Sequence, residues 1–410
     1  MSEPIRPAET RRAALAFIFV TVLLDMLAFG MVIPVLPELV VGFLGGDTAR
    51  GAAIYGLFGT LFALMQFLFA PVQGALSDRF GRRPVILLSN FGLALDYAVM
   101  ALAPTVGWLF VGRVISGITS ASFSTAGAYI ADVMPPEKRA GGFGMLSVAF
   151  GVGFVLGPAL GGVLGSIHPR LPFWVAGGFS LLNALYGLFV LPESLPGERR
   201  GTFDLRRANP VGALVLLRSH PKLFALAAAC FLNYLAHDVQ PSTFVLYTTY
   251  RYAWDQRTVG LVLALVGVCS VIVGGALVQP IVTRFGERWT LLGGLAAGAI
   301  GFALYGAAPT SALFACGIPV VALWGVTFPA AQGLMTRLVL ASEQGQLQGA
   351  VTSLRGIAGL VAPGLFTQVF AMFIDRLRDW RLPGAPFLLA SLLVVGSMAL
   401  AWRVTRPEGL

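Results

Sequence analysis

The sequence has little charge. Only 11% of its 410 residues are charged, while 57% are hydrophobic, whereas roughly a quarter of the residues in a soluble globular chain are charged. So few charges could not cover the surface of a water-soluble protein of this length. The composition therefore excludes that class and predicts a membrane protein. The 50 glycines agree with this prediction, because small residues let membrane helices approach closely.

Cysteine and histidine are scarce as well. Cys230, Cys269 and Cys316 fall within apolar stretches. No secreted-type disulfide framework is readable, and a buried packing role is expected for each. Among the remaining residues no metal cluster, nucleophile–base arrangement or phosphate-binding loop is evident, and only three histidines are present. We therefore expect no metal, no cofactor and no enzymatic activity.

The net charge of +9 does not indicate a nucleic-acid partner. The basic residues sit in short clusters between apolar runs instead of along one face or tail, so we expect no nucleic acid to bind. Lysine occurs only as Lys138 and Lys222, an arginine preference typical of a GC-rich bacterial genome. The N-terminus carries no cleavage site after its first apolar run, which we therefore interpret as a retained helix.

Twelve stretches approach the ~20 apolar residues that a membrane-spanning helix needs. A polar linker at 196–219 separates six of them, in a half at 1–195, from six others at 220–410. The fold class expected is an all-α membrane protein with two six-helix, pseudo-symmetric halves. The expected spans are 13–37, 52–76, 84–103, 106–131, 141–165, 173–192, 221–247, 257–283, 289–308, 311–338, 346–372 and 385–404.

The distribution of basic residues predicts the orientation in the membrane. If the N-terminus is cytoplasmic, 19 of the 28 Lys and Arg residues fall on the inner side and 7 on the outer side. Cytoplasmic loops carry the excess of basic residues in membrane proteins, so both termini are expected to be cytoplasmic. Three of the outer arginines form one cluster, Arg376, Arg378 and Arg381, which departs from this rule.

The two halves share a motif. The loop after the second span reads SDRFGRR, from Ser77 to Arg83, and the loop after the eighth reads TRFGER, from Thr283 to Arg288. The shared residues are displaced by 205 positions, and Pro158 and Pro363 show the same displacement. Two separated agreements at half the chain length indicate a duplicated six-helix unit, as in transporters with parallel repeats.

Seven stretches of the sequence carry a specific resemblance. They are MQFLFAPVQGALSDRFGRRP (Met65–Pro84), LDY (Leu95–Tyr97), GRVISGIT (Gly112–Thr119), AYIAD (Ala128–Asp132), GFVLGPALGG (Gly153–Gly162), LPES (Leu191–Ser194) and QLQG (Gln346–Gly349). Through them the chain resembles the major facilitator superfamily and, within it, the tetracycline-efflux family of drug–proton antiporters. The resemblance implies a monomer in the bacterial cytoplasmic membrane that exchanges a small amphipathic compound for protons.

The loop that ends at Arg83 allows two interpretations. Gly81 permits a tight turn and the arginines anchor the inner face, so the loop can be a simple topology anchor. Asp78 can also pair with Arg82 or face the N-terminus of another helix. The resemblance implies a gating role, in which such contacts hold one face shut. The residues expected in this network are Asp78, Arg79, Gly81, Arg82, Arg83, Asp132 and Arg139.

Asp25 and Asp96 each lie about 12 residues into an expected span, or roughly 18 Å along a helix. A carboxylate at that depth costs at least ~2.5 kcal/mol, so either a structural hydrogen bond or a function must retain it. We favour proton coupling or substrate binding. Arg113 needs a partner at its depth, for which both aspartates are candidates, unless it extends to the outer headgroups. The resemblance implies a role in proton coupling for Arg113.

A glycine stripe with a proline runs along the fifth span. Residues four apart lie on one helix face, so the stripe allows close contact with a neighbouring helix. The resemblance implies that this element marks antiporters and sets how the two halves meet. Packing alone would also account for the glycines. The residues are Gly153, Gly157, Pro158, Gly161 and Gly162.

The second half departs from the tetracycline exporters. Its ninth span has no acidic residue, and Cys269 or a neighbour stands where they carry a histidine. His237 and Asp238 either replace these polar groups or lie solvated near the outer mouth, and Arg355 is expected to be a further buried cation. The substrate therefore stays open. The residues expected to line the cavity are Gln66, Tyr97, Phe123, Asn233, Tyr234, His237, Asp238, Gln240, Phe328 and Gln332, and Tyr55 is a further candidate.

Several functions compete at this level. A proton-coupled exporter uses the buried carboxylates and accounts for the Gly-Pro element. A proton-coupled symporter that imports a nutrient fits the same fold, and apart from the Gly-Pro element only the direction of flux separates it from the exporter. An exporter of an unidentified metabolite is a further alternative. A membrane sensor without transport leaves the buried charges without a role. We expect the exporter, with protons, a small molecule and the lipid bilayer as its partners.

Overall fold

The structure is a computed structural model, and it describes residues 8–120, 122–135, 138–200, 214, 216–217, 221–340 and 343–406. All regular elements within these ranges are helices. Nine of the helical runs there are long and apolar enough to cross a membrane. They contain ten of the twelve expected spans, because the run Gln256–Ala307 holds two of them. The remaining two spans are each broken into a pair of shorter helices, so the prediction of the fold class is confirmed.

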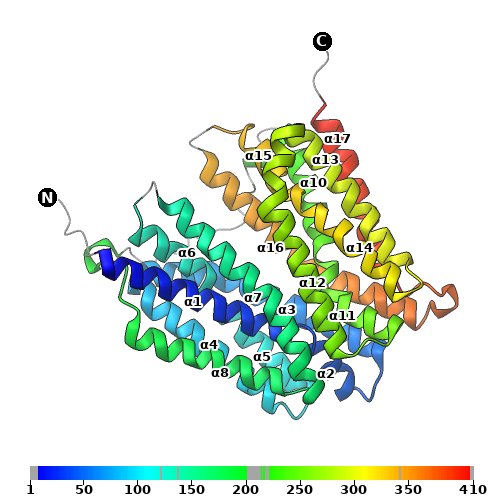
Figure 1. The fold of residues 1–410 in the computed structure, drawn as a ribbon, viewed down its shortest axis with the longest axis horizontal. Helices are drawn as coiled ribbons and strands as arrows, with labels where there is room; N and C mark the ends of the chain where they lie inside the picture. Colours follow the sequence, from blue (N-terminus) through cyan, green and yellow to red (C-terminus); the bar gives the residue numbers. More distant parts are fainter. Residues whose placement is uncertain are drawn as a thin grey trace. The chain divides into compact units, whose positions relative to one another are not determined.

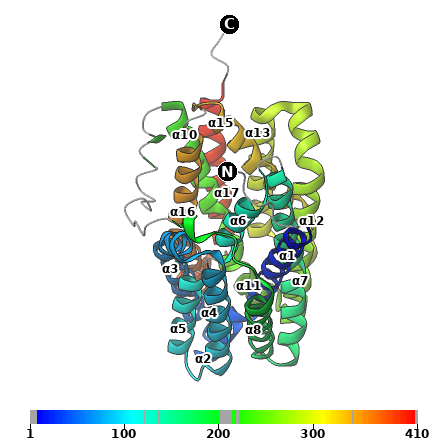
Figure 2. The same ribbon diagram turned by 90° about the vertical axis from the view of Figure 1, so that its left-hand side faces the viewer.

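The chain divides into two compact units, the first of which contains 1–36 and 64–208. Within it, α1 packs along α7 and α8, and α4 packs against α8 and α5. Figure 2 shows α4 and α5 side by side. Its helices are α1 (Ala8–Val32), the later part of α3 (Thr48–Phe80), α4 (Arg82–Leu102), α5 (Val106–Thr119), α6 (Ser122–Val133), α7 (Arg139–Ile167) and α8 (Leu171–Val190).

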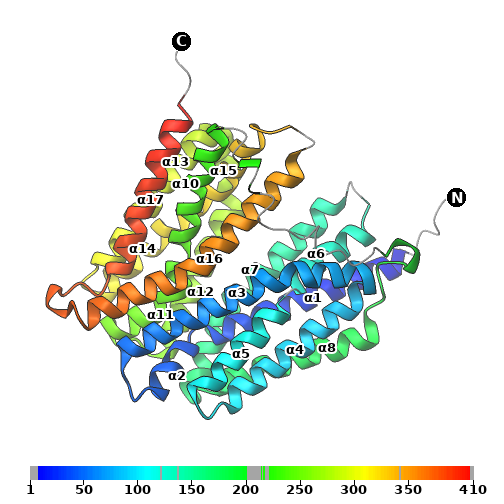
Figure 3. The ribbon, with the colours of Figure 1, turned by 180° about the vertical axis from the view of Figure 1, so that it is seen from behind.

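The second unit contains 37–63 and 209–410. Within it, α17 packs against α10 and α13, as Figure 3 shows. The sequence-based division at 195 and 220 stays a prediction. The helices of this unit, labelled in Figure 1, are α2 (Leu36–Phe43), the beginning of α3, α10 (Pro221–His237), α11 (Val239–Tyr252), α12 (Gln256–Ile272), α13 (Val278–Ala307), α14 (Ser311–Leu323), α15 (Thr327–Thr336), α16 (Gln344–Ile374) and α17 (Ala385–Val404).

Two local features stand out along the expected spans. The seventh span changes from α10 to α11 at Asp238, directly before the first residue of α11. Between the eighth and ninth spans the backbone leaves the helical conformation at Gly286, whose φ of 74° and ψ of 163° resemble the 105° and 164° of Gly81. The expected loop between these two spans is therefore a turn at a glycine, and both copies of the repeated motif fall on such a turn.

Large apolar side chains cover the outer faces of many helices. Phe189, Leu392 and Leu88 are 82%, 68% and 65% exposed. Exposed apolar surface on this scale marks an interaction surface, and lipid is the surrounding that suits it. The expectation that all three cysteines are buried is wrong, because Cys230 is buried whereas Cys316 is exposed. Cys316 lies on an outward face of α14, where a small apolar side chain suits lipid as well as a protein core.

Candidate functional site

A buried ion pair joins α4 and α5 in the first unit. Asp96 Oδ2 lies 3.4 Å from an Arg113 guanidinium nitrogen, and the two side chains are 0% and 9% exposed. The same nitrogen lies 3.1 Å from the Met100 sulfur. Arg113 therefore does not extend to a headgroup region but pairs with one of its two candidate partners. Both charged groups of a buried ion pair lose their hydration, so the pair contributes little to the stability of the fold. Its presence therefore favours a functional role.

Gly112 brings these two side chains together. A Cβ atom on Gly112 would lie 2.7 Å from Asp96 Oδ1 and 2.6 Å from Met100 Cγ, distances that real side chains do not adopt. Helix α5 can therefore approach α4 only because this residue has no side chain. The ion pair therefore depends on the glycine directly before Arg113. Gly112 was not predicted as a site residue, because the sequence alone does not show that α4 packs against it.

The second membrane carboxylate, Asp25, lies between α1 and α8. Asn183 donates from Nδ2 to Asp25 Oδ1 at 3.1 Å and to the Thr21 carbonyl at 3.2 Å. The Thr21 hydroxyl donates in turn to Asn183 Oδ1 at 3.1 Å. All three residues are buried. Sequence reasoning missed Asn183, although an asparagine within an apolar span is itself a sign of a polar contact inside the membrane.

Tyr97 follows Asp96 directly on α4, and its side chain is buried. The expectation that Tyr97 lines the substrate cavity stays a prediction. The first unit thus carries two buried carboxylates, one buried guanidinium and one buried phenol on three helices, α1, α4 and α5.

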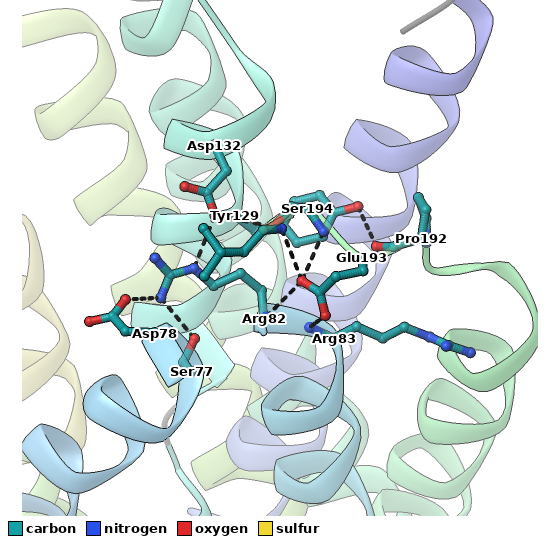
Figure 4. Close-up of polar contacts among 10 residues, drawn as sticks. Ser77, Asp78, Arg82, Arg83, Tyr129, Asp132, Pro192, Glu193 and Ser194 are labelled. Atoms are coloured by element: carbon teal, nitrogen blue, oxygen red, sulfur yellow. Dashed lines mark hydrogen bonds and ion pairs between the residues drawn. The ribbon is translucent and has the colours of Figure 1, made fainter. Parts of the chain in front are cut away.

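Arg82 is the centre of a polar network at the α3–α4 turn, drawn in Figure 4. It lies 2.6 Å from Asp78 and 3.0 Å from Asp132 of α6, and it donates to the Ser77 hydroxyl at 2.9 Å. Only 12% of its side chain is exposed. Ser194 donates to Asp132 at 3.1 Å, which ties the end of the unit's last helix into the same network.

Glu193 caps the N-terminus of α4 from the segment after α8 (Figure 4). Its carboxylate accepts hydrogen bonds from the backbone N–H groups of Arg82 at 2.8 Å and Arg83 at 3.3 Å. An anion at this position is stabilised by the unpaired N–H groups and the helix dipole. Gly81, with φ of 105°, leaves the space, because a Cβ atom there would collide with the Glu193 carboxylate. In the sequence, Glu193 stands out only as part of the LPES stretch that carries the family resemblance, and its capping role could not be predicted.

Two residues expected in this network take no part in its ion pairs. Arg79 lies over the Phe80 ring, 5.3 Å from the centroid, because successive helical residues point about 100° apart and Arg79 faces away from Asp78. Arg139 donates to the Met134 carbonyl at 3.2 Å. Arg83 contributes through its backbone, and its side chain donates to the Leu188 carbonyl at 2.6 Å. The network is therefore smaller than the motif that predicted it.

The glycine stripe of α7 packs on α1. Cβ atoms on Gly153 and Gly157 would lie 2.5 Å from Met26 Cβ and 2.8 Å from Gly30 Cα, and one on Gly161 would collide with the Met31 backbone. Pro158 faces the same surface, since a Cβ atom on Gly30 would lie 2.9 Å from its Cδ. Gly162 is buried on α7 as well. These contacts lie within the first unit, so they account for the stripe by packing.

Four rings gather in the second unit. Tyr234 stacks on Phe328 at 5.6 Å, and His237 lies 5.7 Å from Phe328 and 5.6 Å from Trp324. Asn233 holds the cluster, because it accepts from the Trp324 indole at 2.7 Å and donates to the Thr327 hydroxyl at 3.2 Å. Trp324 was not expected here, since one tryptophan among seven carried no distinguishing signal.

Polar groups border this aromatic cluster. His237 Nδ1 lies 3.4 Å from Asp238 Oδ1, with side chains 43% and 26% exposed. The Nε2 atoms of Gln240 and Gln332 are buried and make no hydrogen bond within the part of the chain that the structure describes. A buried amide without a partner costs free energy, so such groups are candidates to bind a ligand.

The remaining expected residues are dispersed. Gln66 donates to the Ser120 hydroxyl at 3.2 Å in the first unit, and Tyr55 donates to the Pro241 carbonyl at 3.3 Å in the second. The side chain of Phe123 lies outside the described residues. The expectation that Arg355 is buried is wrong, because it is exposed on α16. Position within a span does not say which face of a helix a side chain occupies.

Comparisons with known proteins agree with this fold. A family model described as Major Facilitator Superfamily matches residues 18–363, and a second match covers 226–409. The class C tetracycline resistance protein of Escherichia coli is 40% identical over 358 residues, which are 87% of this chain and 90% of that protein.

Solved structures match over nearly the whole chain. The human organic anion transporter MFSD10 (TETRAN) is 26% identical, with a TM-score of 0.69 over 97% of this chain and 100% of the other. A bacterial homologue of the human lysosomal transporter Spinster, in an inward-facing and occupied conformation, has a TM-score of 0.79 at 18% identity. It covers 99% of this chain and 98% of its own. That second likeness shows the fold alone.

Proposed function

The chain belongs to the Major Facilitator Superfamily, and within it to the tetracycline resistance proteins, and from this premise we propose that it exports small amphipathic, tetracycline-like compounds in exchange for protons. The observation that carries the proposal is the buried Asp96–Arg113 pair inside an apolar helical bundle. A charge pair in that position is costly to retain. Uptake and release of a proton by Asp96 would explain why the ion pair is present, whereas helix packing does not require a charge pair there.

The proposed coupling works through the strength of this pair. When Asp96 is ionised, it holds Arg113 at 3.4 Å. When it takes up a proton, the attraction is lost and Arg113 is left as a buried charge, a change on the order of a few kcal/mol. Each proton that moves inward supplies about 2.3 kcal/mol per 100 mV of membrane potential. The driving force and the switch therefore have comparable size.

Asp25 is the second proposed coupling residue. It accepts a hydrogen bond from Asn183, so its carboxylate is already oriented between α1 and α8. Asp25, Asp96 and Tyr97 are all buried in the first unit. We propose that Asp25 and Asp96 each take up and release a proton during transport, and that binding of a proton there excludes substrate.

The Arg82 network is the proposed gate. In the predicted orientation, with both termini cytoplasmic, the α3–α4 turn lies on the inner face. Arg82 and Asp132 there connect α4 to α6, and Glu193 connects α4 to the segment after α8. A set of contacts that closes in one state and opens in the other is what alternating access requires. Asp78, Gly81 and Arg83 belong to this gate.

The aromatic cluster of the second unit is the proposed substrate-contacting surface. Tyr234 and Phe328 offer stacked faces to a planar ring system, and the amides of Gln240 and Gln332 can hydrogen-bond its oxygens. His237 and Asp238 supply a polar edge. Such surfaces, mostly apolar with a few placed polar groups, are typical of small-molecule sites. The transporter acts as a monomer in the bacterial cytoplasmic membrane, with six-helix halves at 1–195 and 220–410.

The test is uptake into inverted membrane vesicles that hold an imposed pH gradient, with tetracycline and a panel of amphipathic drugs. We expect accumulation that collapses with a protonophore. Asp25→Asn and Asp96→Asn should each abolish gradient-driven uptake but retain exchange of labelled for unlabelled substrate, which shows a folded protein. The control is Asp379→Asn, an exposed aspartate in the Arg378–Trp380 turn.

The outcomes separate the competing functions. Gradient-driven uptake that survives both neutral substitutions would refute the coupling mechanism. Uptake into right-side-out vesicles instead of inverted ones would identify an importer. No flux of any compound in either orientation, in vesicles shown to hold their gradient, would remove tetracycline-like compounds as substrates.

A further inference from the structure

Seven basic residues lie on the predicted outer side, and the proposed transport mechanism uses none of them. Two of these, Arg50 and Arg376, line one cavity in the second unit, at the beginning of α3 and the end of α16. Figure 3 shows this end of α16, in orange, beside the beginning of α3, in blue. The cavity has a volume of about 740 Å³.

The rim of the cavity carries both signs of charge. Asp47, Arg50, Asp375 and Arg376 all line it, and all four are exposed. None of them forms an ion pair with another charged group among the residues that the structure places. Asp47 is positioned by the start of α3, because its Oδ1 accepts from the Arg50 backbone N–H at 2.9 Å. Two cations and two carboxylates thus stand at one opening without neutralising one another directly.

The wall of the cavity is mostly aliphatic, with Gln368 as its one uncharged polar side chain among the lining residues. Its other residues are Ala49, Ala53, Val361, Gly364, Leu365, Val369, Ala371 and Met372. Val361 and Met372 are 49% and 41% exposed, so the slot opens sideways toward the surroundings of the helices. The lining contains no aromatic ring. A flexible hydrocarbon chain fits such a wall better than a planar ring system, which would find no face to stack on.

Helices α3 and α16 approach each other closely beside the cavity. A Cβ atom on Gly59 would lie 2.7 Å from Pro363 Cβ, and one on Gly56 would lie 3.0 Å from the Pro363 carbonyl oxygen and would collide with the Thr367 hydroxyl. Both helices also contribute lining residues to the cavity. A molecule inside it would therefore contact both helices.

We propose that this cavity binds a zwitterionic phospholipid of the outer leaflet that carries a primary amine. The phosphate lies between Arg50 and Arg376, the ammonium lies against Asp47 and Asp375, and one acyl chain runs down the aliphatic wall. Arginine is well suited to phosphate, and carboxylates complete the match to an ammonium with N–H donors. The bound lipid accounts for arginines on the side of the membrane where basic residues are otherwise few.

The proposal rests on the proposed function only for the orientation in the membrane, and its test does not measure transport. The purified protein is exchanged into detergent with defined amounts of phosphatidylethanolamine, phosphatidylcholine or phosphatidylglycerol, and bound lipid is counted by native mass spectrometry. We expect one retained phosphatidylethanolamine, bound at least tenfold more tightly than phosphatidylcholine, whose methylated amine cannot donate to Asp47 and Asp375. Phosphatidylglycerol, which lacks the amine, should bind more weakly as well.

Matched variants locate the lipid. Arg50→Gln combined with Arg376→Gln should lower retention at least tenfold, whereas Arg378→Gln, on the same loop but outside the cavity, should leave it unchanged. Leu365→Trp fills the slot and should also expel the lipid, and its control is Leu392→Trp on the exposed face of α17. A variant that has unfolded is recognised because it no longer elutes as one monodisperse peak in size-exclusion chromatography. Because the double arginine variant and Leu365→Trp should each remove the lipid, the test does not depend on either variant alone.

Three results would overturn the proposal. Equal retention of all three lipids would show that the headgroup is not read. Retention that is unchanged in both the double arginine variant and Leu365→Trp would place the lipid elsewhere. Displacement of the lipid by tetracycline at transport concentrations would make the cavity a substrate site. Asp96→Asn should retain the lipid fully, so failure of the transport mechanism and failure of this site are distinguishable.

Discussion

The turn at Gly81 and the turn at Gly286 are the same structural element in two units. Both glycines have positive φ, 105° and 74°, and both follow an Arg-Phe pair. In each turn the following residue forms an ion pair with a helix some 50 residues later. Arg82 lies 3.0 Å from Asp132, and Glu287 lies 2.9 Å from Arg337. Position 287 is 82 displaced by 205, and 337 is 132 displaced by the same number.

The two ion pairs therefore occupy equivalent positions with their charges exchanged. The cation is on the turn in the first unit and on the later helix in the second. The duplicated backbone can hold the pair in either arrangement of charges. It keeps the two positions close together, and it does not fix which of them carries the positive charge. This repeat was invisible as a residue match, since Arg and Glu count as a mismatch.

The surroundings of the two pairs differ. Arg82 is 12% exposed and has Asp78 and Ser77 as further partners, with Glu193 capping the helix beneath it. Arg337 is 74% exposed. Arg288 next to the second pair lies over the rings of Trp289 and Trp402, at 5.1 and 5.3 Å. The ion pair at the first turn is thus part of a larger hydrogen-bonded network, whereas Arg337 of the second pair is mostly solvated. We therefore expect gating to depend mainly on the first turn.

The largest effect is expected for Arg82→Glu. It replaces the shared cation by a carboxylate next to Asp78 and Asp132, which removes two ion pairs and adds repulsion on the order of 3 kcal/mol, or about a hundredfold in an equilibrium. Initial transport rates in inverted vesicles should fall at least tenfold. The matched control is Glu287→Arg in the second turn, where transport should stay within twofold. Equal losses in both turns would show that they share the gating role.

Exchanging the two charges within each ion pair tests the same difference between the two turns. Arg82→Glu with Asp132→Arg recreates the polarity of the second unit, but Asp78 then faces the new glutamate, so only part of the transport rate should return. Glu287→Arg with Arg337→Glu should behave as the unmodified protein, because no third charge is paired there. Full recovery in the first unit would mean that Asp78 contributes nothing.

The glycines that face the repeated prolines come next. Gly30→Ala would place a methyl group 2.9 Å from Pro158 Cδ, and Gly59→Ala would place one 2.7 Å from Pro363 Cβ. Overpacking of this kind costs about 1–3 kcal/mol, so both variants should melt several degrees lower in detergent. Gly144→Ala on α7 is the control, since nothing lies within 4 Å of its added methyl group. Destabilisation by only one of the two would show that the seams are not equivalent.

Glu193→Gln should have a smaller effect. The amide keeps an acceptor oxygen at the N-terminus of α4 but loses the charge, which is worth about 1 kcal/mol at a helix N-terminus. Thermal unfolding should shift by a few degrees at most, and the shift should shrink in high salt. Glu343→Gln is the control, because this glutamate accepts a hydrogen bond from the Leu340 N–H at 3.0 Å, within an exposed turn and away from α4. An equal shift for both would remove the special role of Glu193.

Arg337→Gln should have the smallest effect. An exposed ion pair contributes about 0–1 kcal/mol, so neither melting nor transport should change measurably. A clear loss of transport on this substitution would contradict the distinction between the two turns, and a loss of stability alone would show that the ion pair is stronger than its exposure indicates.

The fold was predictable from the sequence to a large extent. Apolar length located all twelve spans, because a bilayer demands about 20 such residues each time. The displacement of 205 located the repeat. The turn between the eighth and ninth spans was predictable as well, because Gly286 falls in the expected loop. The change from α10 to α11 at Asp238 was not predictable, because it depends on packing that a hydropathy pattern does not contain.

The candidate site was predictable in kind more than in detail. Sequence reasoning singled out Asp25, Asp96 and Arg113 because isolated charges in apolar spans are rare. It left open which aspartate meets Arg113, and that choice was made by the approach of α5 to α4 at Gly112. Asn183, Glu193 and Trp324 were missed, since a polar or aromatic residue reveals its role only through a partner far away in the chain.

Composition was enough to place this protein in a bilayer, and the displacement of 205 residues indicated two related halves with charges inside them. These properties depend on residue content and spacing along the chain, which can be read without a structure. The pairing of Arg113 with Asp96, the exposure of Arg355 and the exchanged charges at the second turn depend instead on how the helices pack. Such choices depend on which helix faces come within 4 Å of each other, and the chain settles that only when it packs.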